Sequence, residues 1–299
     1  MDSIIPQLIV NSIIAGSIYS LVALGFNLIY GTTKFFNLAH GVLAAVGGYV
    51  VFYLTKSGSA GTGLGLSLIP AIIIGALVAG LIGYLLDKSV FLQLRKRKAS
   101  SMVFLVASLG MMTAIQAIIA IIFSSQFQTL STGSGFGSGD TKVYEFLGGV
   151  ITQVQVVILI SAIIIMIALV CLLKYTRFGK AVRAVSDEED VAKIVGINTN
   201  KIISKIFFIG SAIAGYAGIM VGLDTGIEPT MGLSLLLKGV IASIIGGVGN
   251  IFGGVIGAFV LAFVENFGIW KISGEWKDAI AFAVLIIFLL FRPQGILKK

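Results

Sequence analysis

Long apolar runs recur along this chain, and they constrain its fold more than any other feature. A helix needs roughly 20 apolar residues to cross the hydrocarbon of a bilayer. Runs of that length are expected to form full spans near residues 7–31, 35–54, 64–87, 101–123, 150–173, 202–223 and 277–292. Because the apolar residues are continuous rather than alternating, they predict helices and not barrel strands. We therefore expect an all-α polytopic membrane protein, with residues 1–299 forming a single transmembrane domain.

The stretch 233–267 is long enough for two short helices, but the sequence GGVGN interrupts it at 246–250. Irregular backbone at membrane depth is tolerated where protein or a water-filled cavity covers it. The two halves either cross the membrane separately or form a re-entrant pair. About eight transmembrane helices are expected: the seven full spans together with this broken or re-entrant pair.

The composition agrees with this class and excludes several kinds of site. Hydrophobic residues make up 57% of the chain and charged residues 11%, whereas about a quarter of the residues in soluble domains are charged. The one cysteine, Cys171, cannot form a disulfide within the chain or a cysteine-based metal site. The one histidine, His40, excludes a histidine cluster. No metal site is expected.

The distribution of Lys and Arg predicts the orientation of the helices. Under this span assignment, sixteen of the 21 basic residues fall on one side of the membrane. The five on the other side are Lys56, Lys142, Lys238, Lys271 and Lys277. Because cytoplasmic loops are rich in basic residues, the N-terminus is expected outside and the C-terminus in the cytoplasm. The basic residues have no interleaved aromatics and belong to no soluble binding module, so nucleic-acid binding is not expected.

The one long, densely charged segment of the chain, residues 174–205, is expected on the cytoplasmic side. It holds seven basic residues and four consecutive acids at 187–190. One interpretation is a solvated loop that merely joins two spans. The other is a docking surface, because apolar side chains on a charged helix suit a partner's groove. The aliphatic residues expected to be exposed there are Val191, Ile194, Val195 and Ile197.

Two helices are predicted inside this segment, and the second is the better defined. Ser186 and Glu189 have the spacing of a capping box, and Glu189 precedes Lys193 by the four residues that favour an ion pair. Gly196 suits the end of a helix. The pattern predicts a helix over 187–195, after a less certain helical stretch over 177–185.

Two carboxylates near the outer ends of apolar segments, Glu228 and Glu265, are expected to be solvated groups at the membrane interface. Without a deeply buried carboxylate, there is little basis for a carrier driven by protons. The outer loops are short, and one of them is rich in Gly and Ser over residues 131–139.

Small residues recur at a spacing of four in two apolar segments, which allows helix backbones to approach closely. The first stripe includes Gly210, Gly218 and Gly222, and the second includes Gly249, Gly253 and Gly257. Both are expected to pack helices together, within the chain or at a seam with a second subunit.

Four motifs occur in order along the chain. They are GSIYSLVALG with LIYG at 16–31, FNLAHG at 36–41, the pattern Gly179-x-x-x-Arg183-Ala184 followed by Asp187, Ala192 and Gly196-Ile197-Asn198, and the glycine-rich stretch from 246 to 257. Together they resemble the permeases of branched-chain amino acid ABC transporters. The resemblance covers nearly the whole chain and is closest to the LivH-type subunit.

The resemblance implies one permease subunit of an ATP-driven importer in the cytoplasmic (inner) membrane of a bacterium or archaeon. Its implied partners are a second, LivM-type permease subunit, two cytoplasmic ATPase subunits and an external or periplasmic solute-binding protein. No P-loop occurs in the sequence, so ATP and Mg²⁺ are expected on the ATPase subunits, and the chain is not expected to be an enzyme.

The resemblance also implies roles for individual residues. The expected coupling surface for the ATPases comprises Gly179, Arg183, Ala184, Asp187, Ala192 and Gly196. Candidates for the translocation path or a gate are Asn37, His40, Gly41 and Asn250. For two of these a structural role is the alternative: His40 as a neutral imidazole bonded to a carbonyl at a helix end, and Asn37 as an N-cap or an interhelical hydrogen bond.

A second functional class stays open, namely a self-sufficient secondary carrier or channel. Carriers often have a pair of broken helices at corresponding positions of two repeated halves, whereas this chain shows one clear break, at 246–250. Within the transporter family, the expected substrates are leucine, isoleucine and valine, and the alternatives are other small neutral amino acids, amides and urea.

Overall fold

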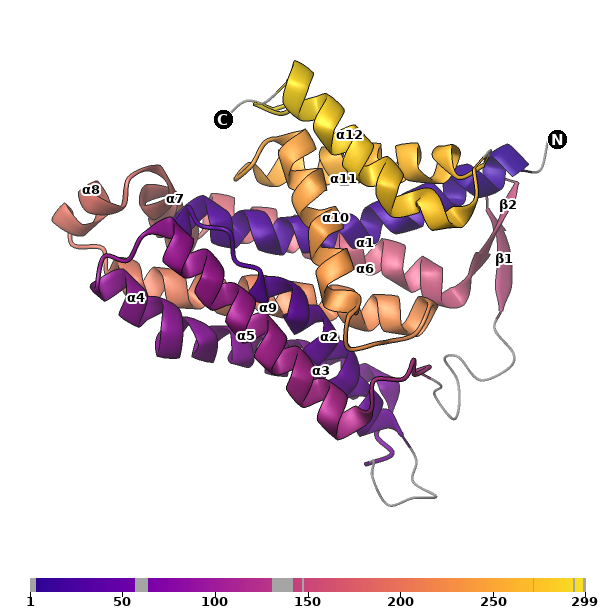
Figure 1. Ribbon diagram of the computed structural model, residues 1–299, viewed down its shortest axis with the longest axis horizontal. Coiled ribbons are helices and arrows are strands. Elements are labelled where there is room, and N and C mark those ends of the chain that lie inside the picture. The colour runs from indigo at the N-terminus through magenta and orange to yellow at the C-terminus, as the bar shows by residue number, and fades with distance from the viewer. Residues whose placement is uncertain are drawn as a thin grey trace.

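The computed structural model describes residues 4–56, 64–130, 142–146, 148–270, 272–292 and 294–297. The Gly/Ser-rich loop predicted at 131–139, part of the loop after Thr55, and the basic residues Lys271, Lys298 and Lys299 lie outside this set. In the described part the chain forms a helical bundle elongated in one direction (Figure 1). The helices are α1 (Ile4–Thr33), α2 (Ala39–Thr55), α3 (Leu68–Leu86), α4 (Leu92–Lys96), α5 (Ser101–Phe123), α6 (Gln153–Tyr175), α7 (Arg177–Asp187), α8 (Glu189–Ile194), α9 (Thr199–Asp224), α10 (Met231–Gly246), α11 (Ile251–Gly268) and α12 (Lys277–Phe291).

Among the described residues, six helices are long and apolar enough to cross a membrane. They are α1, α5, α6, α9, α11 and the continuous stretch Leu68–Lys96, in which a π-helical segment (Asp87–Phe91) joins α3 to α4. The prediction of a helical polytopic membrane protein is therefore confirmed.

Two of the predicted full spans, 35–54 and 277–292, are shorter helices of 17 and 15 residues. The helix α2 begins only at Ala39, because Lys34 adopts a φ of 56° and the chain turns before the helix starts. The helix that contains the predicted span 64–87 begins at Leu68 and continues through the π-helical segment to Lys96.

One small β hairpin accompanies the helices without changing the predicted helical class. Strands β1 (Val143–Phe146) and β2 (Gly149–Thr152) form an antiparallel hairpin. Their β-branched and aromatic residues favour extended backbone, and Gly148 supplies the positive φ of the turn. The side chain of Gln7 on α1 holds the hairpin by bonding both the N–H and the C=O of Val150, at 2.7 and 3.1 Å.

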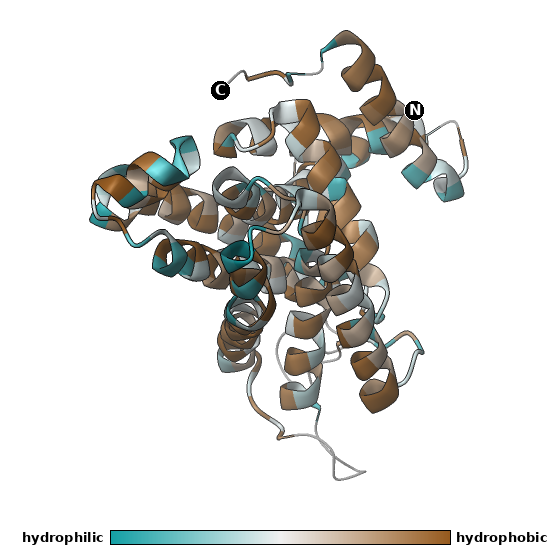
Figure 2. Cartoon of the chain, turned by 60° about the vertical axis from the view of Figure 1, so that its left-hand side comes forward, coloured by the Kyte–Doolittle hydropathy of each residue, from teal (hydrophilic) through white to brown (hydrophobic). Residues whose placement is uncertain are grey.

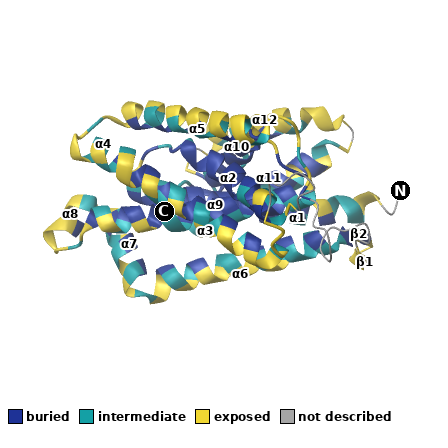
Figure 3. Cartoon of the chain, turned by 90° about the horizontal axis from the view of Figure 1, so that it is seen from below, coloured by how far each residue is buried: buried dark blue, intermediate teal, exposed yellow. Residues whose placement is uncertain are grey.

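The core of the bundle lies between α1, α2, α9 and α10, whose residues are mostly buried, and the buried face of α11 (Figure 3). The helices α5, α6 and α12 lie at the periphery and have many exposed apolar side chains. In a bilayer, such side chains face lipid or a second membrane subunit.

Glycines allow the inner helices to pack at backbone contact. Gly218 on α9 lies against the backbone of Ala44 on α2, and Gly210 on α9 lies against the backbone of Gly25 on α1. In the hairpin of α10 and α11, Gly257 faces the backbone of Ala242. Gly253 also lies against the backbone of Gly246, whereas Gly222 contacts the side chains of Leu130 and Ile227.

Gly249 is an exception, because it does not belong to a helical stripe with Gly253 and Gly257. It lies before α11 with a φ of 83°, and Gly247 has a φ of 113°. Such backbone conformations favour glycine. Asn250 then caps α11 by accepting a hydrogen bond from the N–H of Gly253 at 3.1 Å.

Other parts of the chain cover this break between α10 and α11. The N–H groups of Ile296 and Leu297 donate to the last carbonyls of α10, at Ile245 and Gly246, over 2.8 and 3.0 Å. The break is therefore satisfied by protein hydrogen bonds, as irregular backbone at membrane depth requires. The stretch predicted as a broken pair is a helical hairpin.

Replacing Gly218 with leucine is expected to destabilise the permease fold severely. A side chain there overlaps the backbone of Ala44, and overpacking a tight core costs about 1–3 kcal/mol or more. The matched control is Gly110→Leu on α5, where the added side chain meets nothing within 4 Å. Thermal aggregation of the two purified variants in detergent checks this. Equal melting temperatures would contradict the close α2–α9 contact.

Candidate functional site

The charged segment forms two helices that meet at a corner, which corrects the predicted helix over 187–195. The first, α7, continues to Asp187, and α8 runs only from Glu189 to Ile194. Glu188 interrupts them with extended backbone, at a φ of −151°. The predicted capping box is wrong, because Ser186 lies inside α7 and its hydroxyl donates to the carbonyl of Gly31 on α1 at 2.8 Å.

Besides this contact with α1, α7 is fixed to the end of α6. Thr176 caps it by accepting from the N–H of Gly179 at 3.0 Å. The guanidinium of Arg183 donates to the carbonyl of Leu173 at 2.6 Å, and Gly179 packs directly on the backbone of Leu173. Two of the predicted coupling residues, Gly179 and Arg183, therefore hold the corner between α6 and α7.

The second helix, α8, is joined to α9. The hydroxyl of Thr199 donates to the carboxylate of Glu189 at 3.1 Å, and the same carboxylate pairs with Lys193 at 3.0 Å, as the spacing predicts. Hydrogen bonds to Glu189 and Asp190 raise the pKa of the Lys193 ammonium. The side chain of Ala192, which belongs to α8, is buried.

The outward side of α8 carries an apolar edge, formed by Val191, Ile194 and Val195, which we term the α8 edge. These side chains are 52%, 83% and 68% exposed. Ile197 is only partly buried and packs on the core, unlike the predicted exposed position. Gly196 ends the segment with a φ of 85°. The α8 edge lies at one end of the long direction, in a region where hydrophilic residues also gather (Figure 2).

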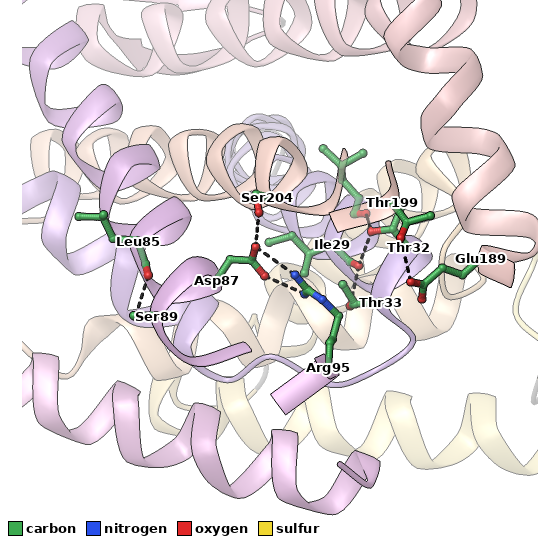
Figure 4. Close-up of polar contacts among 11 residues, drawn as sticks. Ile29, Thr32, Thr33, Leu85, Asp87, Ser89, Arg95, Glu189, Thr199 and Ser204 are labelled. Atoms are coloured by element: carbon green, nitrogen blue, oxygen red, sulfur yellow. Dashed lines mark hydrogen bonds and ion pairs between the residues drawn. The ribbon is translucent and has the colours of Figure 1, made fainter. Parts of the chain in front are cut away.

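A buried ion pair, which the sequence analysis missed, lies near this end of the bundle (Figure 4). Asp87, at 0% exposure, accepts two hydrogen bonds from the guanidinium of Arg95, at 2.7 and 3.2 Å, and a third from Ser204 on α9 at 2.5 Å. An acid inside an apolar run, with an arginine eight residues later, was the available signal. The pair joins the Leu68–Lys96 helix to α9, the helix that also holds α8.

A cavity of about 340 Å³ lies between α7, the end of α1 and the start of α11. Arg183, Asp187 and Asn250 all line it, so the structure brings together predicted coupling residues and one predicted path residue. Asn27 supports its wall by accepting from the N–H of Gly249 at 3.0 Å and donating to the carbonyl of Asn250 at 3.2 Å.

The other three predicted path residues lie in tightly packed surroundings at the start of α2. His40 is fully buried against Gly25, with its imidazole close to the backbone of Val22 on α1. Asn37 is not an N-cap, because that position belongs to Leu38, which makes no side-chain capping bond. The side-chain oxygen of Asn37 is also buried without a described partner. Gly41 packs on the backbone of Gly232.

At the opposite end of the bundle, Glu265 is buried at 0% exposure, which corrects its predicted solvation. The hydroxyl of Tyr19 donates to its carboxylate at 2.7 Å, and the ammonium groups of Lys238 and Lys277 lie at 3.7 and 3.8 Å. The tight packing of α1, α10 and α12 around α11 removes this carboxylate from solvent. Glu228 is exposed, as predicted.

The sequence profile of the family described as "Branched-chain amino acid transport system / permease component" matches residues 8–289. The chain belongs to this family. It is a permease component of a transport system and not an enzyme.

Named relatives of this permease cover nearly its whole length. The chain is 30% identical to "High-affinity branched-chain amino acid transport system permease protein BraD" of Pseudomonas aeruginosa, over 98% of this chain and 95% of the relative. It is 32% identical to the corresponding LivH protein of Escherichia coli K12, with the same shares covered. It is 31% identical to a probable LivH protein of Methanocaldococcus jannaschii, over 96% and 90%. No solved structure matches the chain.

Proposed function

We propose that this permease is the LivH-type membrane subunit of an ATP-driven importer of branched-chain amino acids. Its relatives over nearly the full length carry names from high-affinity branched-chain amino acid transport. The proposed assembly contains a second, LivM-type permease subunit, two cytoplasmic ATPase subunits that bind ATP and Mg²⁺, and an external solute-binding protein. It resides in the cytoplasmic membrane of a bacterium or archaeon.

The proposed orientation places the N-terminus outside and the charged segment in the cytoplasm. Lys and Arg are concentrated on the side assigned to the cytoplasm, and α8 lies at the end of the bundle opposite the N-terminus and the β hairpin (Figure 1). In this orientation the shorter helices α2, α10 and α12 complete the crossing of the bilayer together with the six long helices. The proposal for the whole chain is thus seven full spans together with α10 and α11 as the broken pair, counted as about eight spans.

The coupling proposal rests on the exposed α8 edge and on the hydrogen bonds that fix α7 and α8 to the membrane helices. Hydrogen bonds join α7 to the ends of α1 and α6, and α8 to α9. A displacement of α8 by the ATPases therefore reaches three membrane helices directly. In this proposal the α8 edge and Gly196 meet the ATPase. Gly179, Arg183, Ala184, Asp187 and Ala192 form the body that transmits the movement.

The proposed cytoplasmic end of the translocation path is the cavity beneath α7. Asn250 lines it together with Arg183 and Asp187, so movement of α7 changes the shape of the cavity. Asn37, His40 and Gly41 stay candidates for a gate. The side chains of Asn37 and His40 are buried at the start of α2, so a movement of α2 relative to α1 and α10 changes their surroundings.

Uptake by reconstituted vesicles tests this function. The complete importer, with its binding protein and internal ATP, is expected to concentrate leucine, isoleucine or valine. Vesicles that contain the permease subunits without the ATPases are expected to show no concentrative uptake. Concentrative uptake without the ATPases would instead establish a secondary carrier.

Because Glu265 is buried, a carrier driven by protons is the kind of secondary carrier to test. The contacts of this carboxylate with Lys238 and Lys277 explain its burial without a transported proton, since buried charges require partners. An imposed pH gradient across vesicles lacking the ATPases is therefore expected to drive no uptake.

A further inference from the structure

A second cavity, of about 380 Å³, lies where α6 and α12 begin and α9 ends. Six helices line it, namely α1, α6, α9, α10, α11 and α12. Its volume falls within the range of small-molecule sites, which are about 300–1,000 Å³. The cavity is therefore large enough for a small amino acid.

The walls of this outer cavity combine charges of both signs with an aliphatic surface. Lys238 and Lys277 supply cations, and Asp224 supplies a carboxylate. Ile14, Ile18 and Leu235 supply aliphatic side chains, each less than 9% exposed. Ionisable groups inside a membrane protein are costly, and they commonly mark the path of a polar substrate.

The contacts of the two lysines differ, which assigns them different tasks. The Lys238 ammonium lies 3.2 Å from the hydroxyl of Tyr19 and 3.2 Å from the carboxylate of Asp278. The Lys277 ammonium faces Glu265 at 3.8 Å, beyond hydrogen-bond distance. Lys277 therefore has donors to offer a ligand, while Lys238 and Glu265 hold their neighbours in position.

The carboxylate of Asp224 supplies the negative charge in the wall of the same cavity. One of its oxygens accepts from the side-chain amide of Gln155 at 3.1 Å. A carboxylate accepts at two oxygens and about four lone-pair positions, so this bond orients the group and leaves capacity for a ligand's ammonium.

We propose that the outer cavity binds an aliphatic amino acid as its zwitterion. The α-carboxylate meets Lys277, the α-ammonium meets Asp224, and the side chain lies on Ile14, Ile18 and Leu235. This site rests on the proposed function and specifies where the permease receives its substrate.

Charge balance favours a zwitterion over other small solutes. The buried and half-buried groups Lys238, Lys277, Glu265 and Asp224 sum to zero, and Asp278 is 64% exposed to solvent. A zwitterion keeps this balance and pairs both of its charges. An uncharged amide or urea can hydrogen-bond to both groups but neutralises neither charge, and a free monocarboxylate or amine adds one net charge to the cavity, which is costly where water is largely excluded.

Protection of an introduced cysteine measures this binding directly. The chain has one cysteine, so Cys171→Ala removes the native thiol from this subunit, on which the labelling is then measured. Ser234→Cys then places a thiol in the cavity wall, where Ser234 is exposed. The complete importer, purified without the binding protein, is labelled with N-ethylmaleimide. Binding of valine with a Kd of about 1 mM is expected to slow labelling by about tenfold at 10 mM valine.

The ligand series separates the solute classes. Valinamide, which lacks the carboxylate, isovalerate, which lacks the ammonium, and isovaleramide, which lacks both charges, are each expected to protect less than valine. Asp224→Asn keeps the shape of the side chain and is expected to abolish protection by valine. Glu228→Gln, an exposed carboxylate four residues away, is the matched control and is expected to leave protection unchanged.

A position control and two outcomes complete the test. Ser273→Cys, exposed and outside the cavity, is expected to be labelled at the same rate with and without valine. Protection of Ser234→Cys that is absent, or that survives Asp224→Asn unchanged, overturns the site. If the wild-type importer still concentrates branched-chain amino acids, only this site fails. If that uptake is absent as well, the proposed function fails.

Discussion

Ile194→Asp is expected to abolish transport by the assembled importer while the permease stays folded in the membrane. Ile194 is 83% exposed, and surface substitutions of this kind change folding stability by about 0.5 kcal/mol or less. In the complex, however, the proposed interface buries this side chain in an apolar groove, where an unpaired charge is costly. A loss of about 3 kcal/mol in association lowers the affinity for the ATPase by about 100-fold.

Co-purification of the ATPase with tagged permease, and uptake by the same preparation, measure this effect. The matched control is Ser100→Asp, which adds the same charge at an exposed position directly before α5, where aspartate is a favourable helix cap. Ile194→Leu keeps the apolar edge and is expected to retain both properties. Normal co-purification and uptake with Ile194→Asp would show that the α8 edge is not the coupling surface.

Arg95→Met is expected to destabilise the fold by about 3–5 kcal/mol, because it leaves a fully buried carboxylate without its cation. Asp87 is 0% exposed and receives two of its three hydrogen bonds from Arg95. The remaining bond from Ser204 does not offset a buried charge. Unfolding of the purified permease in increasing dodecyl sulfate, followed by circular dichroism, measures the loss.

Lys193→Met is the matched control, because it removes the cation of an ion pair that is half-exposed. Exposed pairs contribute about 0–1 kcal/mol, so the unfolding midpoint is expected to shift little. The double variant Asp87→Leu with Arg95→Met removes both charges and is expected to recover most of the lost stability, as paired replacements of buried ions often do. Equal stability of Arg95→Met and wild type would contradict the burial of the pair.

The approximate positions of the long helices could be predicted, because the length of an apolar run is a local property of the sequence. The start of α7–α8 and the glycine at their end also followed from local spacing, as did the Glu189–Lys193 pair. The capping box failed because a tertiary partner competed for the same side chain. The hydroxyl of Ser186 bonds to α1, 155 residues earlier in the chain, and no local pattern encodes that partner.

A genuine capping box occurs elsewhere, at the start of α6. Thr152 accepts from the N–H of Gln155, and the Gln155 side chain accepts from the N–H of Thr152, at 3.3 and 3.1 Å. The same sequence spacing was present at Ser186 and at Thr152. The difference lies in the backbone before each residue: a β hairpin leads into Thr152, whereas Ser186 continues a helix that Thr176 has already capped.

The charged groups of the outer cavity were visible in the sequence, but their association was not. Glu265 stands near Trp270 in the chain, a position typical of a solvated interface. Its burial depends on Tyr19 and Lys238, which belong to other helices. A lysine inside an apolar run, as at Lys238, was the available signal, because such a cation requires a partner at the same depth.

The length of the Leu68–Lys96 helix has a consequence for the surrounding lipid. At 1.5 Å per residue its 29 residues extend about 43 Å, whereas the hydrocarbon of a bilayer is about 30 Å thick. Asp87 lies about 30 Å from the first residue of this helix. With Leu68 at the outer edge of the hydrocarbon, as in the proposed orientation, the pair of Asp87 with Arg95 falls where acyl chains give way to phosphates. A thicker bilayer draws that pair into hydrocarbon, and anionic headgroups compete with Asp87 for Arg95. Membrane thickness and phospholipid charge are therefore expected to tune the stability of this permease.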